Sequence, residues 1–179
     1  MKLNVGSGQR KFDISKGWIN VDRIYSRGTI KVGDKDVPST PDVAADAAQL
    51  PFKDCSASMV VCHHLLEHLG CGDGDGLIKE SYRVLCPGSS LLVFTPNLRA
   101  LAARWLVNQI SEYTYMVNSY GAYMGKEEDR HKWGYSQEGL LYYLQLQASW
   151  SEVKLFDWRS IEGAEIARDF WIAGVEAVK

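Results

Sequence analysis

Three polar sites in the first third of the chain each follow a short apolar run directly: Gly6-Ser7-Gly8, Asp22 and Asp46. Glycines in such a turn let backbone N–H groups approach a ligand without interference from a Cβ atom. A carboxylate that ends the next strand can accept hydrogen bonds from ribose hydroxyls, and one that ends a third strand can meet an adenine amino group. The spacing favours an adenosine site, with an ordinary turn and two carboxylate caps as the alternative.

The glycine turn lacks the features that bind a chain of phosphates. Lys11 stands where the pattern G-x-G-x-x-G requires its last glycine, so a pyrophosphate cradle is not supported. No Gly-Lys-Ser/Thr sequence occurs, which excludes a Walker loop. Adenosine without a phosphate requirement indicates S-adenosylmethionine rather than NAD.

The run His64-Leu65-Leu66-Glu67-His68 spells H-x-x-E-H, the inverted zinc-peptidase motif. That chemistry needs two histidines on one helix face and the glutamate as general base. The run follows a strand candidate directly, however, and the glycine-rich residues 70–74 limit a helix here to about two turns. We therefore expect no metal ligands, and a zinc hydrolase using His64, Glu67 and His68 is the less favoured alternative.

Three histidines are candidates for a catalytic group. Neighbouring side chains point in opposite directions where a strand ends, so only one of His63 and His64 can face a cofactor. His131 lies in the charged stretch 126–133 and is a candidate for the acceptor site, with a solvated loop as the alternative. Six aromatic residues are expected in loops over this site. A lid or an acceptor pocket is one interpretation of them, and plain packing or a homodimer interface is the alternative. The six residues are Tyr113, Tyr115, Tyr120, Tyr123, Trp133 and Tyr135.

Positioning these residues requires strands that end at one edge of a sheet. Short apolar runs bounded by Gly, Pro, Asp or Asn predict buried strands at 3–5, 18–21, 42–45, 57–62, 91–94, 153–156 and 170–178. Helical spacing predicts helices over 75–85, 98–110 and 137–148. This alternation indicates an α/β sheet. Residues 9–21 leave room for only a short or broken helix before Asp22.

Composition describes an ordinary globular chain without a strong charge bias. Its 179 residues carry a net charge of −2, with 46% apolar and 23% charged residues. These values fit one domain spanning 1–179 and disfavour nucleic-acid binding. The four cysteines form no C-x-x-C pair. We expect neither a signal peptide nor a membrane-spanning helix, and therefore no membrane partner and a cytoplasmic location.

Five short segments carry a recognisable combination of residues: 3–8, 17–22, Asp46 with Leu50-Pro51-Phe52, 65–69 and 80–88. In this order they resemble segments of small class I S-adenosylmethionine-dependent methyltransferases of type 11, namely LNLGCG, GWiNvD, D…LPF, vLEHl and E..RVLKPGG. Ser7 replaces the usual cysteine, and Cys86 and Ser89 replace a lysine and a glycine in a turn. The resemblance covers residues 2–97, with a looser similarity at 131–141.

The resemblance implies a Rossmann-like class I methyltransferase sheet, mostly parallel with an antiparallel last strand and a short or broken first crossover helix. Gly6, Ser7 and Gly8 would contact the methionine end of S-adenosylmethionine, Asp22 the ribose, and Asp46 with Ala47 the adenine. His63 or His64 would line the site.

The implied reaction is methyl transfer by in-line displacement to a small molecule or glycan-type metabolite. A module that binds S-adenosylmethionine without catalysis is the alternative. Residues after 97 match no acceptor-binding signature, so the acceptor is not identified by the resemblance.

Overall fold

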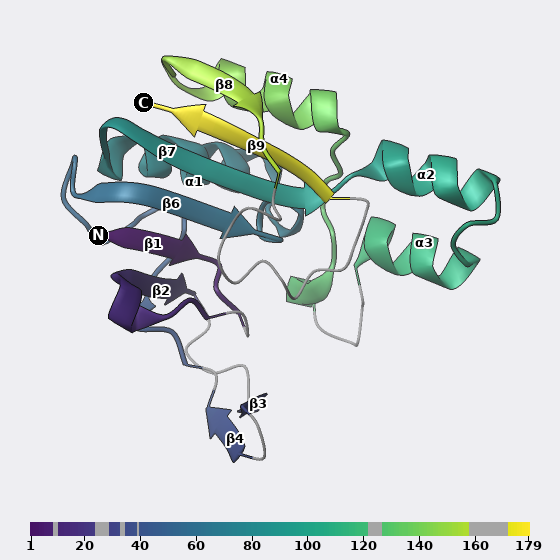
Figure 1. The fold of residues 1–179 in the computed structure, drawn as a ribbon, viewed down its shortest axis with the longest axis horizontal. Helices are drawn as coiled ribbons and strands as arrows, with labels where there is room; N and C mark the ends of the chain where they lie inside the picture. The colour runs from purple at the N-terminus through teal and green to yellow at the C-terminus, as the bar shows by residue number, and fades with distance from the viewer. Residues whose placement is uncertain (9–10, 24–28, 33–34, 39, 122–126, 158–171) are drawn as a thin grey trace.

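A seven-stranded sheet with the order β5-β2-β1-β6-β7-β9-β8 forms the centre of the molecule (Figure 1). The computed structural model describes residues 1–8, 11–23, 29–32, 35–38, 40–121, 127–157 and 172–179. The strands are β1 (Lys2–Val5), β2 (Trp18–Asp22), β5 (Val43–Ala44), β6 (Ala57–His63), β7 (Leu85–Pro96), β8 (Glu152–Leu155) and β9 (Ile172–Val178). Strand β1 pairs in parallel with β2 and with β6, so the strand order reverses at β1.

Helices α1 (Cys71–Val84) and α4 (Gln137–Gln147) pack on one face of this sheet (Figure 1). Successive side chains of a strand point to opposite faces, and both faces of β6 are buried. Val60 therefore belongs to the core under the helices, whereas Val61 joins a smaller cluster with Trp18 and Phe94. This burial on both faces explains why the central strands are apolar without alternation.

The expected topology is confirmed. Strands β5, β2, β1, β6 and β7 pair in parallel, and the last strand, β9, is antiparallel to β7. The first connection holds only the 3-10 turn η1 (Ile14–Lys16) between β1 and β2 in the part of the chain that is described. Asp13 caps this turn by accepting a hydrogen bond from the Ser15 N–H, and Gly17 ends it with a φ of 81°.

An antiparallel hairpin and a helix were not predicted from the sequence. Strands β3 (Thr29–Val32) and β4 (Lys35–Pro38) form a separate antiparallel hairpin. Helix α3 (Glu112–Tyr120) begins after Ser111, whose side chain accepts a hydrogen bond from the Thr114 N–H. The expectation that Tyr113, Tyr115 and Tyr120 lie in loops is therefore wrong, because all three belong to α3. Tyr123 lies outside the described residues.

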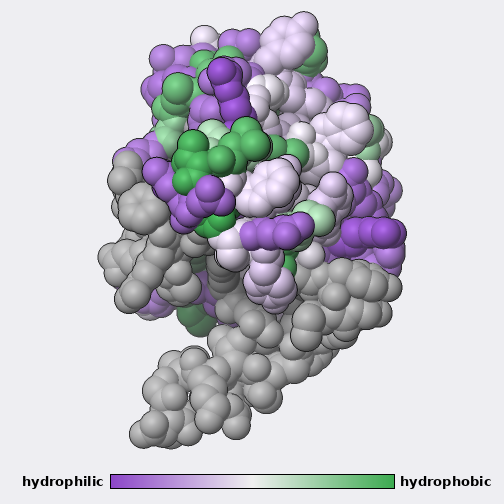
Figure 2. Space-filling model, turned by 90° about the vertical axis from the view of Figure 1, so that its right-hand side faces the viewer, coloured by the Kyte–Doolittle hydropathy of each residue, from purple (hydrophilic) through white to green (hydrophobic). Residues whose placement is uncertain are grey.

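Helices α2 (Leu98–Leu106) and α3 lie side by side at one end of the molecule (Figure 1). Trp105 and Tyr115 stack between them, with ring centroids 4.6 Å apart and an interplanar angle of 9°. Figure 2 shows hydrophobic side chains gathered on this end of the molecule. The exposed apolar and aromatic side chains of the two helices and their connection are Trp105, Leu106, Val107, Tyr113, Met116 and Tyr120. No described helix, these two included, is long and apolar enough to span a membrane.

Arg83 and Glu80 of α1 hold the segment 50–52 against the helix. The guanidinium of Arg83 donates to the carbonyls of Leu50 and Phe52 at 3.0 and 2.8 Å, and to Glu80 Oε1 at 2.7 Å. Glu80 Oε2 accepts the Leu50 N–H at 2.8 Å. The hydrogen bond from Arg83 lowers the pKa of Glu80 below 4.5, although partial burial opposes this shift. This clamp fixes the segment that begins three residues after Ala47.

We expect Glu80→Gln to lower the free energy of unfolding by about 1–3 kcal/mol near neutral pH, because it removes charge-assisted hydrogen bonds. The lowered folded-state pKa means that this contribution is present above pH 4.5 and is lost as the pH falls through the folded pKa. Urea denaturation at neutral and acidic pH measures it. Glu138→Gln is the control, because Glu138 pairs with Arg99 at 3.7 Å on the exposed surface. Equal losses in both variants would contradict the clamp.

Candidate functional site

The turn Gly6-Ser7-Gly8 follows β1 and is tied to the end of β2. The N–H groups of Gly6 and Ser7 both donate to the carbonyl of Val21, at 2.8 and 3.0 Å. The N–H of Gly8 donates to Asp22 Oδ2 at 2.7 Å. Gly6 has a φ of 71°, in the left-handed region that glycine adopts most readily. The glycine turn and the carboxylate that follows the next strand therefore form one hydrogen-bonded unit.

Leu65 fills the space beside Gly6. A Cβ atom on Gly6 would lie 2.7–2.9 Å from three side-chain atoms of Leu65, closer than carbon atoms approach each other. Ser7 is buried beside it, and its Oγ has no hydrogen-bond partner among the described residues. Buried hydroxyls are nearly always paired, so this atom offers a bound ligand a hydrogen bond.

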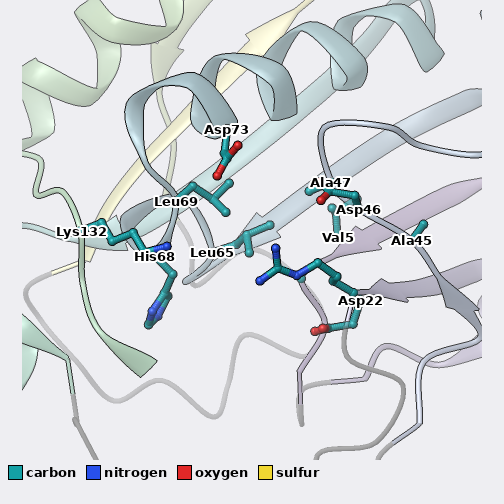
Figure 3. Close-up of a pocket in the computed structure, with 12 residues that line it drawn as sticks. Val5, Asp22, Ala45, Asp46, Ala47, Leu65, His68, Leu69, Asp73 and Lys132 are labelled. Atoms are coloured by element: carbon teal, nitrogen blue, oxygen red, sulfur yellow. The ribbon is translucent and has the colours of Figure 1, made fainter. Parts of the chain in front are cut away.

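A pocket opens where β1, β2 and β5 end (Figure 3). Its empty volume, counted together with the solvent space at the open mouth, is about 690 Å³. Asp22 and Asp46 lie on one side and His68 and Lys132 on the other (Figure 3). The lining consists of Val5, Gly6, Asp22, Arg23, Ala45, Asp46, Ala47, Leu65, His68, Leu69, Asp73 and Lys132.

The two carboxylates predicted for an adenosine site differ in their surroundings. Asp22 is only 5% exposed, whereas Asp46 lies on the surface. Asp46 Oδ1 accepts the Ala48 N–H at 2.9 Å, which is the turn-capping role given as the alternative from the sequence. Asp46 also lines the pocket, so the capping bond coexists with the position that the predicted adenine contact requires.

The H-x-x-E-H run does not form the helix that a zinc-peptidase motif requires. His63 ends β6, residues Leu66–His68 form the 3-10 turn η2, and α1 begins only at Cys71. His64 itself has a φ of 53°, which turns the chain away from a helical path. His64 and His68 therefore do not share a helix face, and the zinc-hydrolase alternative lacks its geometry.

Glu67 is a buried carboxylate whose charge is stabilised by histidines. Its side chain is 1% exposed, and His64 Nδ1 lies 2.9 Å from its Oε1. Burial by itself would raise the pKa of Glu67, but the hydrogen bond from His64 and the charges of His64 and His68 lower it. Glu67 Oε2 has no hydrogen-bond partner within the described chain.

Residues 131–133 close the other wall of the pocket by binding to η2. The N–H groups of Lys132 and Trp133 donate to the carbonyl of Glu67 at 2.7 and 3.2 Å. The ring of His131 packs edge-on against that of His68, with centroids 4.7 Å apart. Burial lowers the pKa of His131, so its neutral form is favoured.

The structure brings together most of the residues predicted to bind the cofactor. Gly6, Asp22, Asp46 and Ala47 line the pocket directly, and Ser7 and Gly8 belong to the same glycine turn. The catalytic candidates His63, His64 and His131 are not among the described residues that line it.

The pocket is also lined by residues that were not predicted from the sequence to bind a cofactor. They are Val5, Arg23, Ala45, Leu65, His68, Leu69, Asp73 and Lys132. Four of them, Leu65, His68, Leu69 and Lys132, lie in segments 65–69 and 131–141. The resemblance of these two segments to methyltransferases was the only feature of the sequence that indicated a role for these four residues. Neither segment indicated that they would face each other.

Comparisons with known proteins agree with this geometry. The family described as "Methyltransferase domain" matches residues 10–93. The chain is 30% identical over 151 residues to the demethylmenaquinone methyltransferase of Streptomyces avermitilis, covering 80% of this chain and 62% of that protein. It is 30% identical over 186 residues to the demethylmenaquinone methyltransferase of a Mycobacterium species, covering 92% of this chain and 76% of that protein. This chain thus spans less than two thirds of the Streptomyces relative.

Solved structures share the fold. A SAM-dependent methyltransferase from Archaeoglobus fulgidus gives a TM-score of 0.59 at 16% identity, over 99% of this chain and 85% of that one. A SAM-dependent methyltransferase from Methanosarcina mazei gives 0.56 at 18% identity, over 99% and 91%. The sheet and its pocket define a Rossmann-like α/β protein with the class I methyltransferase fold. The chain belongs to the S-adenosylmethionine-dependent methyltransferases, and S-adenosylmethionine is the cofactor of that family.

We expect Gly6→Ala to lower the free energy of unfolding by about 2–5 kcal/mol, because it adds left-handed strain and a clash with Leu65. Gly17→Ala is the matched control: Gly17 has a φ of 81°, but nothing lies within 4 Å of its added Cβ atom. Strain alone predicts a loss of about 1–2 kcal/mol there. Chemical denaturation measures both, and equal losses would show that Leu65 does not constrain the turn.

Proposed function

We propose that this protein transfers a methyl group from S-adenosylmethionine to a small-molecule acceptor. The observation that carries the proposal is the convergence of Gly6, Asp22, Asp46 and Ala47 on one pocket, from three parallel strands that end at the same edge. In open α/β sheets, ligands bind beyond the carboxyl ends of the strands where the strand order reverses. Here the order reverses at β1, directly before Gly6.

The groups around the pocket suit the parts of this cofactor. The nearly buried carboxylate of Asp22 would accept hydrogen bonds from the ribose hydroxyls. Asp46 and Ala47 would border the adenine, and the glycine turn with its unpaired Ser7 hydroxyl would receive the methionine end. His63, whose ring packs against that of Phe94 with centroids 5.7 Å apart, is proposed to support the cofactor from the end of β6.

When bound, S-adenosylmethionine supplies the methyl group on a sulfonium leaving group that is already activated by its positive charge. The protein then has to align the acceptor for in-line displacement and exclude water, and these effects supply several kcal/mol. An acceptor hydroxyl also requires a base. We propose His64 for that role, because Glu67 binds its Nδ1 atom and so leaves Nε2 to accept a proton.

We propose a quinone-type or glycan-type metabolite as the acceptor. The first is supported by the two relatives named demethylmenaquinone methyltransferase. The second is the class that the motif resemblance implies. Trp133, which is 54% exposed and directly follows the pocket residue Lys132, offers an aromatic surface on which either kind of ring can pack. His131 lies on the same segment and is proposed to contribute to the acceptor side.

Calorimetric titration with S-adenosylmethionine and S-adenosylhomocysteine tests the cofactor site. We expect binding of both, and a dissociation constant about 10- to 100-fold higher in Asp22→Ala, which removes charge-assisted hydrogen bonds. Asp13→Ala is the control, because Asp13 is the carboxylate that caps η1 and it lies outside the pocket lining. Near-UV circular dichroism shows whether both variants remain folded. Failure of the wild type to bind either compound would contradict the proposal.

Turnover is followed with cofactor labelled on its methyl group and separate panels of quinol, phenol and glycan acceptors. For a hydroxyl acceptor we expect His64→Gln to lower kcat by about 10²–10⁴-fold with an unchanged dissociation constant for the cofactor. Label transfer to none of the panels, with intact cofactor binding, would favour the non-catalytic module instead.

A further inference from the structure

Three side chains of metal-ligand type from two distant segments meet beside the pocket. Glu67, His68 and His131 each offer one oxygen or nitrogen atom, and these atoms all lie within 4.8 Å of one another. Glu67 and His68 belong to η2, whereas His131 follows the 3-10 turn η3 (Glu127–Asp129). The cluster is thus assembled by tertiary structure.

Main-chain contacts hold the two segments together. In addition to the bonds from Lys132 and Trp133 to the Glu67 carbonyl, the His131 N–H donates to the carbonyl of Tyr120 at 3.0 Å. Gly121, with a φ of 86°, lets α3 end against the main chain of residues 129–131, where a Cβ atom would overlap the backbone. The position of His131 is therefore fixed from both sides.

The side chains of Glu67 and His68 have hydrogen-bond partners of the kind that metal ligands usually have. His68 Nδ1 lies 3.2 Å from the carbonyl oxygen of Arg130. A main-chain group therefore orients the ring of His68. Glu67 Oε1 is bound to His64, while Oε2 is buried without a partner among the described residues. Hydrogen bonds of this kind orient ligating histidines and carboxylates in known sites.

We propose that Glu67, His68 and His131 bind a divalent transition-metal ion. Two imidazoles and one carboxylate suit Zn²⁺ and the neighbouring first-row ions. Bonds of 2.0–2.2 Å hold tetrahedral ligand atoms about 3.3 Å apart, so atoms within 4.8 Å would have to close by about 1.5 Å at most. The ion would also satisfy the unpaired Glu67 oxygen. This site departs from the expectation of no metal ligands.

The ion would lie at the edge of the proposed acceptor site. His68 lines the pocket opposite Asp22, and Lys132 directly follows His131 (Figure 3). Three protein ligands leave at least one coordination position open, and an oxygen atom of the acceptor can occupy it. Metal binding itself does not depend on the proposed methyl transfer, whereas this role for the open position rests on it.

The test uses the full chain, purified without a polyhistidine tag and stripped with a chelator. Calorimetry with Zn²⁺ measures the stoichiometry, and absorption spectroscopy with Co²⁺ reports the ligand set. We expect one ion per chain and a Co²⁺ spectrum without thiolate charge-transfer bands. Absence of binding, or thiolate bands from the exposed Cys55 or Cys71, would overturn the proposal.

Single substitutions then locate the ion. We expect His68→Asn and His131→Asn each to raise the dissociation constant for Zn²⁺ by at least about tenfold. His63→Asn is the matched control, because His63 lies outside the cluster. Thermal unfolding shows whether each variant is folded, and the two separate histidine variants keep the test valid if one is not. Unchanged affinity in a folded ligand variant would exclude the site.

Two further titrations separate this inference from the proposed function. Acetohydroxamate, an oxygen-donor chelator, should change the spectrum of the Co²⁺ protein if a coordination position is open, and an unchanged spectrum would exclude the acceptor role. S-adenosylhomocysteine binding should persist in the folded His131→Asn variant, because His131 is outside the pocket lining. Loss of metal binding with intact cofactor binding therefore concerns this site alone.

Discussion

Two consecutive amides that share one carbonyl oxygen are the constraint on which the pocket depends. The N–H groups of Gly6 and Ser7 both point at Val21, and this fixes the glycine turn to β2 one residue before Asp22. The left-handed conformation of Gly6 makes this arrangement possible, and Leu65 then occupies the place of the missing side chain. One end of the pocket is therefore a product of sheet pairing and of a single residue without a Cβ atom.

The other walls depend on contacts between segments far apart in the chain. Arg83 and Glu80 hold the segment after Asp46 against α1 through main-chain groups, so they fix position without touching the pocket. The carbonyl of Glu67 receives the segment that carries Lys132, while its side chain orients His64. Glu67 thus links the acceptor wall, the proposed base and the proposed metal site through different atoms of one residue.

The convergence of Gly6, Asp22 and Asp46 on one pocket could be predicted from the sequence because it follows from local rules. Apolar runs that stop at Gly6, Asp22 and Asp46 identify parallel strands, and their carboxyl ends must meet at one edge. Helix α3 was missed because Tyr115 and Val117 have low helix propensity, although Ser111 and Glu112 form a recognisable start.

The acceptor side could not be predicted in the same way. The contact between His68 and His131 joins residues 63 positions apart (131 − 68) through a docked segment, and no periodicity encodes such a contact. The H-x-x-E-H spacing, which was the less favoured zinc motif from the sequence, does not form its helix either. The motif binds zinc only when a helix places both histidines on one face, and the left-handed conformation of His64 prevents that helix.

A crystal structure of the protein with S-adenosylhomocysteine tests the central claim most directly. We expect the adenosine between Gly6 and Asp46, with a ribose hydroxyl within hydrogen-bond distance of the Asp22 carboxylate and the sulfur facing the wall formed by His68 and Lys132. A ligand bound elsewhere, or a ribose that makes no contact with Asp22, would contradict the account of this pocket.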